Sequence, residues 1–208
     1  MNLSMFKHVI WDFDGTLFDT YPVMAKIFKD LLEKENIEEP IDEIVKKMQV
    51  SMAFTLNYYK KKYNISSEFI NEYQIQRKIK ELTLAKPFAE IEDICNYIHS
   101  TNRKNYLYTH RGESSVTLLK SHGLYGYFSD FITLEHGFER KPIPDALNYL
   151  IDKHSIHRDE AIMIGDRELD LLAAKNAGIS ACYFNENSEE NDNSDYIIDD
   201  FKQLYAIL

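Results

Sequence analysis

Hydrophobic residues along this chain follow two different spacings, and the change from one to the other divides the chain into parts. Between residue 20 and about residue 84, apolar residues recur every three or four positions, as they do on the buried face of an amphipathic helix. We predict four helices and no strand there, with Ser67 as an N-cap and Pro87 closing the segment. After Pro87, short apolar runs of the strand type alternate with helical patterns.

The alternating part of the chain predicts a parallel sheet. After a first strand at residues 9–11, strands are expected at residues 105–108, 131–133, 161–164, 181–184 and 196–198. Helices are expected at residues 91–100, 113–121, 145–153 and 168–176, and from about residue 201. Strands connected through helices form right-handed crossovers, which give a parallel sheet covered on both faces. We therefore predict an α/β fold: a doubly wound, Rossmann-like parallel sheet core formed by residues 1–18 and 85–208, with a small all-helical domain, residues 19–84, inserted after the first strand.

Composition narrows the class of protein. A chain of 208 residues can bury one core and a small accessory unit. Its net charge of -10 argues against nucleic acid and membrane as partners, because nucleic acids and anionic membranes are bound by basic surfaces. No apolar run approaches the ~20 residues that span a bilayer, and the N-terminus has no signal-peptide pattern, so we expect a cytoplasmic protein. Cys95 and Cys182 are far apart and in no CxxC motif, which predicts buried free thiols.

Two carboxylates directly follow the first predicted strand. The apolar run of residues 9–11 ends at Asp12 and Asp14, which are one residue apart and are followed by Gly15. Ligands of open α/β sheets bind beyond the carboxyl ends of the strands, and a glycine permits the tight turn that this position needs. The pattern alone also fits an acidic turn in which Asp14 binds only its own backbone.

Four further polar residues occupy comparable places. Thr109 follows the strand at residues 105–108, Lys141 precedes Pro142 in a loop that leads into a helix, Asp166 follows the strand at residues 161–164, and Asp170 lies one helical turn later. Each alone has a structural explanation, as a strand-end threonine, a surface lysine, an N-cap and a first-turn acid. Their joint occurrence after successive strands favours a functional site at this edge of the sheet.

The order of these motifs resembles a known enzyme family. The turn Asp12-x-Asp14-Gly15-Thr16-Leu17, then Thr109, Lys141-Pro142 and Gly165-Asp166-x-x-x-Asp170, is similar to the four motifs of the haloacid dehalogenase-like (HAD) hydrolases. Residues 164–178 look most like the phosphoglycolate phosphatase and β-phosphoglucomutase branch, whose helical cap domain is inserted after the first strand. The resemblance covers essentially the whole chain.

The resemblance implies a Mg2+-dependent phosphatase that acts on a small phosphate ester, phosphoglycolate-like or a sugar phosphate. Asp12 would be the nucleophile that forms an aspartyl-phosphate and a metal ligand, and Asp14 the general acid and base and a ligand through its main-chain carbonyl. Asp166 would complete the ligands, Thr109 and Lys141 would hold the phosphoryl oxygens, and Asp170 would support the cluster. A cation is also required on physical grounds, since two unit charges 4 Å apart repel by about 4 kcal/mol at an effective dielectric constant of ~20.

Two places depart from the familiar pattern. Residues 48–52 contain no glycine where relatives commonly have one, and His110 and Arg111 replace a more usual Asn-Lys pair. Arg111 is a candidate for binding a second anionic group on the substrate and His110 for lining the entrance, with solvated side chains as the alternative. Two other functions stay open: a phosphomutase of the β-phosphoglucomutase kind, and a non-catalytic binding or regulatory protein on the same scaffold.

Overall fold

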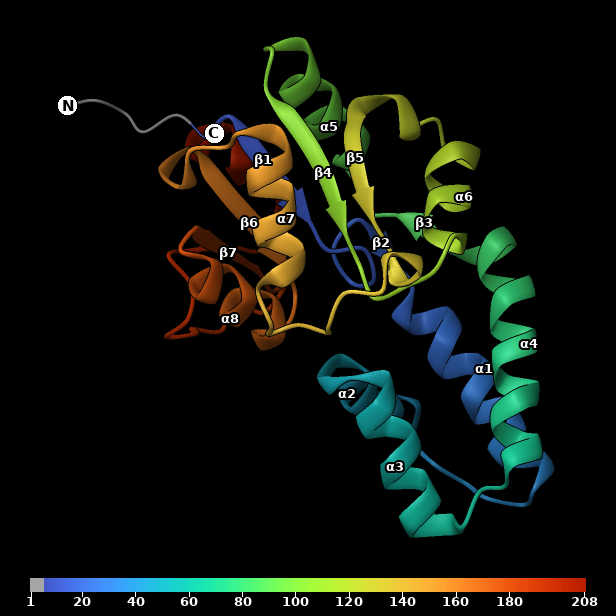
Figure 1. Cartoon of the computed structure of the whole chain (residues 1–208). Coiled ribbons are helices and arrows are strands. Elements are labelled where there is room, and N and C mark those ends of the chain that lie inside the picture. Colours follow the sequence, from blue (N-terminus) through green and yellow to red (C-terminus); the bar gives the residue numbers. More distant parts are fainter. Residues whose placement is uncertain (1–5) are drawn as a thin grey trace. The chain divides into compact units, whose positions relative to one another are not determined.

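The computed structural model describes residues 6–208 and forms two compact units (Figure 1). One unit comprises the chain up to Leu17 together with Pro87–Leu208, and the other comprises Phe18–Lys86. Residues 1–5, which belong to the stretch predicted to lack a signal peptide, lie outside the described residues. Each unit has a hydrophobic core of its own.

The first unit contains a six-stranded parallel sheet in the order β5-β4-β1-β6-β7-β8. The strands are β1 (His8–Trp11), β4 (Lys104–Tyr108), β5 (Phe128–Ile132), β6 (Ala161–Gly165), β7 (Ser180–Phe184) and β8 (Tyr196–Ile198). Central strand β1 pairs with β4 on one side and β6 on the other, so that Trp11 lies opposite both Leu107 and Ile164. The connections run outward in opposite directions from β1, which makes its carboxyl end a topological switch point.

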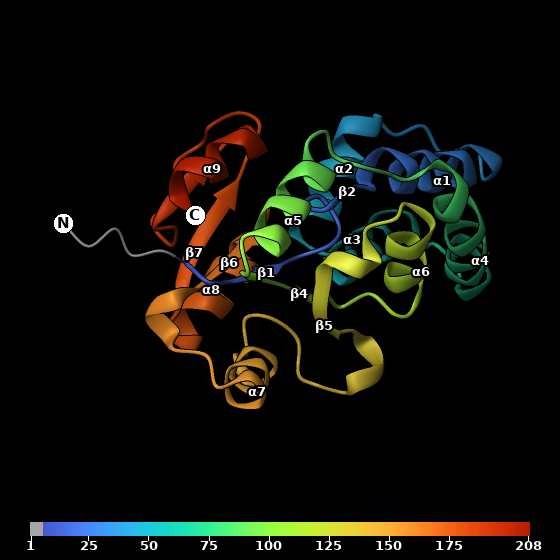
Figure 2. The same cartoon turned by 90° about the horizontal axis from the view of Figure 1, so that it is seen from above.

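Helices cover both faces of this sheet, which confirms the predicted doubly wound α/β architecture. They are α5 (Ile91–Ser100), α6 (Ser114–Ser121), α7 (Asp145–His154), α8 (Glu168–Ala177) and α9 (Leu204–Ile207). Figure 2, along the edge of the sheet, shows α5 and α7 on opposite sides. Because successive side chains of a strand point to opposite faces, Ile10 and Met163 pack with Leu147 of α7 and Leu171 of α8. The interior strands are therefore almost continuously apolar.

The second unit is helical, with α1 (Tyr21–Lys34), α2 (Ile41–Val50), α3 (Met52–Tyr63) and α4 (Ser67–Leu84). Its core surrounds Phe28, whose ring centroid lies 5.0 Å from Tyr59, 5.1 Å from Phe69 and 5.2 Å from Tyr73. The predicted cap at Ser67 was wrong by one residue. Ser66 caps α4, because its extended backbone lets the hydroxyl accept a hydrogen bond from the Phe69 backbone N at 3.1 Å.

Other differences from the predicted elements are small. Strand β5 begins at Phe128 rather than at residue 131, because its first residues pair with β4, and it ends before Thr133. Thr133 instead caps the 3-10 turn Leu134–His136. Two short strands were not predicted: β2 (Phe18–Asp19) and β3 (Lys86–Pro87), which pair with each other.

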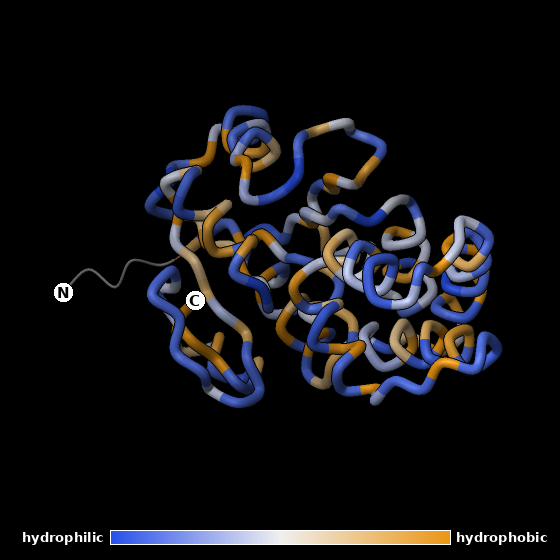
Figure 3. Tube along the Cα trace, turned by 90° about the horizontal axis from the view of Figure 1, so that it is seen from below, coloured by the Kyte–Doolittle hydropathy of each residue, from blue (hydrophilic) through white to orange (hydrophobic). Residues whose placement is uncertain are grey.

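Hydropathy changes from residue to residue along the helices, as the tube in Figure 3 shows. Among residues 6–208, no helix is both long enough and apolar enough to cross a membrane.

Cys95 and Cys182 are buried free thiols, as the sequence predicted. Burial raises the pKa of the Cys182 thiol to about 12, and it also raises the pKa of Cys95.

Candidate active site

Two of the predicted site residues, Asp12 and Asp14, lie at the carboxyl end of β1. Asp12 follows β1 directly, and its backbone N donates to the carbonyl oxygen of Ile164 on β6 at 2.9 Å. Asp12 is almost completely buried, with 1% of its surface exposed. The chain then turns through Gly15, whose φ of 77° lies in the left-handed region that glycine tolerates best. This turn places Asp14 next to the strand end while Asp12 stays in the sheet.

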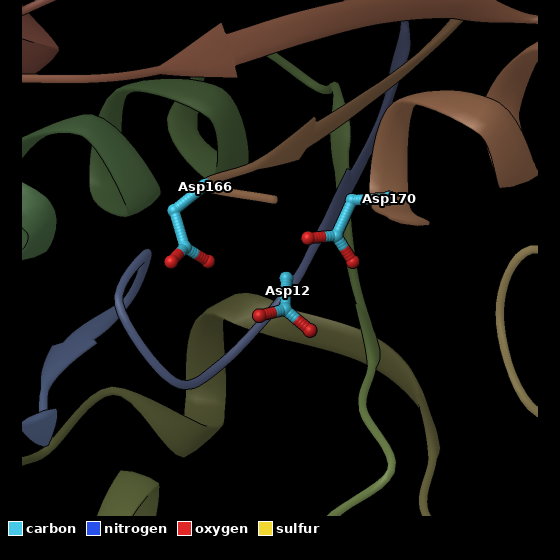
Figure 4. Close-up of side chains that lie close together, drawn as sticks. All are labelled: Asp12, Asp166 and Asp170. Carbon is cyan, nitrogen blue, oxygen red and sulfur yellow. The ribbon is translucent and has the colours of Figure 1, made fainter. Parts of the chain in front are cut away.

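Three carboxylates converge at the ends of β1 and β6 (Figure 4). Asp12, Asp166 and Asp170 each offer an oxygen atom, and these atoms all lie within 4.8 Å of one another. Asp166 follows β6, and Thr16 donates to its Oδ1 at 3.3 Å. Asp170 lies in the first turn of α8 and accepts a hydrogen bond from the backbone N of Arg167 at 3.2 Å. Asp166 is therefore not the N-cap of α8; that position belongs to Arg167.

Gly165 makes room for this arrangement. A Cβ atom added at Gly165 would lie 2.4 Å from Cβ and 2.6 Å from Cγ of Asp170, closer than non-bonded carbon atoms can approach. A residue with a side chain would displace Asp170. The glycine before Asp166 in the sequence motif thus has a packing role.

Lys141 is the fixed cation of the cluster. Its ammonium nitrogen lies 2.5 Å from Oδ1 of Asp12 and 2.7 Å from Oδ1 of Asp170, and it donates to the Tyr108 carbonyl oxygen at 2.9 Å. The side chain is fully buried. Burial alone would lower the pKa of Lys141, but the negative charges of Asp12 and Asp170 outweigh it and raise that pKa. Lys141 is therefore charged at neutral pH.

The two buried carboxylates respond differently to their surroundings. Burial and then the negative charge of Asp170 raise the pKa of Asp12, against the opposing effect of Lys141 and Arg167. For Asp170, the charges of Lys141 and Arg167 outweigh burial and lower the pKa. Asp170 is thus the more firmly ionised partner of Lys141.

Residues 109–111, after β4, supply three different contacts. Thr109 is buried, and its hydroxyl oxygen accepts a hydrogen bond from the Arg111 backbone N at 3.1 Å. His110 accepts through Nε2 from the Lys141 backbone N at 2.8 Å. Arg111 contacts Asp14, with 2.7 Å between Nη1 and Oδ1, and donates through Nε to the Ser114 hydroxyl at 3.0 Å. The structure thus brings His110 to Lys141 and Arg111 to Asp14.

Arg167 is a site residue that sequence reasoning missed. Its Nη2 atom lies 3.4 Å from both carboxylate oxygens of Asp12, and its Nε atom lies 3.6 Å from Oδ2 of Asp170 and 3.9 Å from Oδ1 of Asp166. The sequence feature that could have indicated Arg167 is its position between Asp166 and Asp170, the two acidic residues of the motif.

The acidic cluster fits a divalent cation such as Mg2+. Mg2+ prefers oxygen ligands and is commonly held by one or two carboxylates, with water and substrate oxygens completing its octahedron. Asp12, Asp166 and Asp170 supply such oxygens from three positions, although Oδ1 of Asp12 and Oδ1 of Asp170 both already contact Lys141. Asp166 is the least enclosed by cations, because Arg167 lies 3.9 Å from it, whereas Asp12 and Asp170 each contact Lys141 at 2.5 and 2.7 Å.

Comparison with known proteins identifies a family model and relatives that match this chain. The family model of haloacid dehalogenase-like hydrolases matches residues 9–184. The chain is 26% identical to phosphoglycolate phosphatase from Vibrio parahaemolyticus, covering 97% of this chain and 96% of the relative. It is 31% identical to a Clostridium perfringens protein provisionally named as the pyrophosphatase PpaX, covering 86% and 83%.

A solved structure supports the fold. That of a predicted phosphoglycolate phosphatase from Haemophilus somnus covers 97% of each chain with a TM-score of 0.83, at 19% identity. The predicted enzyme class, a phosphatase, is confirmed by the family match and these relatives. The protein belongs to the haloacid dehalogenase-like hydrolases, and the resemblance read from its motifs holds over most of its length.

Proposed function

We propose that this enzyme is a Mg2+-dependent phosphatase that hydrolyses a small phosphorylated metabolite through an aspartyl-phosphate on Asp12. The observation that carries the proposal is the pair of carboxylates after β1, each in contact with a cation. Lys141 lies 2.5 Å from Asp12, and Arg111 lies 2.7 Å from Asp14. Two oriented carboxylates one residue apart can serve one phosphorus atom in different roles.

In the first step, an Asp12 carboxylate oxygen attacks phosphorus and the bond to the ester oxygen breaks. Asp14 donates its proton to the departing alkoxide, which leaves as an alcohol. In the second step, Asp14 accepts a proton from water, whose oxygen attacks phosphorus. The bond from phosphorus to Asp12 then breaks, which releases inorganic phosphate and restores the Asp12 carboxylate and the protonated Asp14.

Other residues of the site neutralise and orient the transferred group. Lys141 and the Thr109 hydroxyl would hold phosphoryl oxygens, with most effect in the transition state. Mg2+ held by Asp12, Asp166 and the main-chain carbonyl of Asp14 would supply the positive charge that lets an anionic nucleophile approach a phosphate dianion. Asp170 keeps Lys141 in position through their 2.7 Å contact.

The substrate we propose is phosphoglycolate or a similar small ester, with a sugar phosphate as the second choice. The Vibrio parahaemolyticus relative is a phosphoglycolate phosphatase, and so is a relative from Aliivibrio fischeri that is 28% identical to this chain. We assign substrate choice to the helical unit, Phe18–Lys86, acting as the cap domain of a core formed by the remaining residues. In this proposal the core motifs would contact the phosphoryl group, which all the candidate esters share, and so would not select among them.

Phosphate release from a panel of compounds tests the proposal. The panel would contain phosphoglycolate, hexose phosphates, nucleotides, pyrophosphate and p-nitrophenyl phosphate, each with Mg2+ and with EDTA. We expect Mg2+-dependent turnover of a small ester that Asp12→Asn abolishes. The control is Asp159→Asn, an exposed carboxylate in the 3-10 turn before β6. Turnover that survives in Asp12→Asn, or isomerisation of sugar phosphates without hydrolysis, would contradict the proposal.

A further inference from the structure

The carboxylates at the carboxyl ends of β1 and β6 contact two cations that are held very differently. Lys141 is fully buried and makes contacts of 2.5 and 2.7 Å with Asp12 and Asp170. Arg167 makes four contacts with Asp12, Asp166 and Asp170, all between 3.4 and 3.9 Å. Charge-assisted N–H···O bonds are normally 2.7–2.9 Å long, which is about the length of the Lys141 contacts, whereas these contacts of Arg167 with the three carboxylates are all longer.

Arg167 also lies at a helix end, where its backbone is held and its side chain is partly exposed. The residue is the N-cap of α8, and its backbone N is held by Asp170 at 3.2 Å. The side chain retains 15% exposure, whereas that of Lys141 has none. A change of rotamer at a helix end can move the guanidinium while the backbone contacts stay in place.

The guanidinium contacts all three carboxylates, and so it occupies the position that charge favours for a metal ion. The three ionised carboxylates together carry a charge of −3. Lys141 alone would leave a net charge of −2 in the cluster, and Arg167 reduces it to −1. A divalent ion between Asp12 and Asp166 would be repelled by a guanidinium that contacts the same oxygens. The two cations therefore compete for one place.

We propose that Arg167 is a built-in counterion that holds the carboxylate cluster together until a divalent cation displaces it, so that the arginine weakens metal binding and stabilises the metal-free enzyme. This inference rests on the proposed function, because it takes Asp12 and Asp166 as ligands of Mg2+. It concerns a residue to which the catalytic steps assign no role. The concentration of Mg2+ needed to fill the site would therefore depend on Arg167.

Binding of Mg2+ to Arg167→Gln tests the inference without any substrate. Isothermal titration calorimetry at constant ionic strength should give a Kd about tenfold lower than that of the wild type, the change expected when a partly exposed cation stops competing. In EDTA the same variant should melt about 2 to 4 °C below the wild type, because the carboxylates lose a counterion. Arg167→Lys keeps the charge and should stay close to the wild type in Kd.

Arg140→Gln is the matched control, because Arg140 is exposed and precedes Lys141 in the same loop. It removes one positive charge near the site and should leave Kd unchanged. An equal effect of Arg140→Gln, or equal tightening in Arg167→Lys, would overturn the inference. So would a Kd in Arg167→Gln that equals or exceeds that of the wild type.

The two proposals fail in distinguishable ways. If the wild type binds Mg2+ and releases phosphate but Arg167→Gln does not bind Mg2+ more tightly, only the counterion role of Arg167 is refuted. If neither protein binds Mg2+ and no ester is hydrolysed, the proposed function fails and the inference fails with it. Binding that is detectable only in Arg167→Gln would support the inference strongly.

Discussion

Replacing His110 by asparagine should make the protein less sensitive to acid. The Nε2 atom of His110 accepts a hydrogen bond from the Lys141 backbone N at 2.8 Å, which requires that nitrogen to be unprotonated. Burial, followed by the positive charges of Lys141, Arg140 and Arg167, lowers the pKa of His110 from 6.5 to about 3. The imidazole is therefore neutral throughout the physiological range.

The sign of the effect follows from proton linkage. Because the pKa is lower in the folded protein than in the unfolded chain, the unfolded chain binds the proton more readily, and stability falls as the pH decreases from about 6.5 toward 3. With pKa values of 6.5 in the unfolded chain and about 3 in the folded protein, the free energy of unfolding at about pH 4.5 is ~2.7 kcal/mol lower than at neutral pH. Because solvent reaches part of the imidazole ring, we reduce this to about 2 kcal/mol. Asparagine has no proton to gain in this range.

Urea unfolding in EDTA at about pH 7 and about pH 4.5 measures this difference. The wild type should lose about 2 kcal/mol more than His110→Asn between the two values. His157→Asn, at an exposed histidine, is the control and should keep the acid sensitivity of the wild type. Equal losses in the wild type and His110→Asn would refute the reasoning, because His110 would then not be held neutral by its surroundings.

Four further substitutions test other parts of the structure. Lys141→Met leaves Asp12 and Asp170 buried without their shared cation and should cost about 3 to 5 kcal/mol in urea unfolding at neutral pH; a loss below ~1 kcal/mol would contradict the placement of Lys141. Gly165→Ala should cost about 1 to 3 kcal/mol because the new Cβ meets Asp170, while Gly126→Ala, which has open space around it, should change stability little. Ser66→Ala should lower stability by about 1 kcal/mol and Ser67→Ala by no more than ~0.5 kcal/mol, and equal effects would argue against Ser66 as the cap. Arg111→Gln should lower kcat about tenfold or more, because Asp14 loses the partner that orients it; an increase in KM alone would instead favour binding of the substrate by Arg111.

The local sequence contained most of the fold. Apolar positions at helical spacing located α1 to α4, and buried runs located β1, β4, β6 and β7 to within one residue at either end. These patterns are local because a helix or a buried strand is recognised from a few consecutive side chains. The predicted bounds are wrong where an element depends on a partner that is distant in the sequence. Strand β5 is the example, because its first residues are extended through their pairing with β4.

The motifs likewise identified the family and most of the residues at the site. Asp12, Lys141, Asp166 and Asp170 come together because the carboxyl ends of neighbouring parallel strands meet at one edge of the sheet. Asp12 and Asp166 follow strands directly, and Asp170 and Lys141 lie in the first turn of α8 and in the loop before α7, so these positions are visible in the sequence.

Only the tertiary structure decided which side chain each cation contacts. The sequence makes Arg111 a candidate for binding substrate, and the structure shows that it contacts Asp14, while His110 contacts the backbone of Lys141. Arg167 lies between Asp166 and Asp170 in the sequence, but only the structure shows that its guanidinium reaches the carboxylates. Periodicity and spacing place a residue on a strand or a helix, whereas the partner of a long charged side chain depends on distances between elements that are far apart in sequence and on the charges that burial brings together.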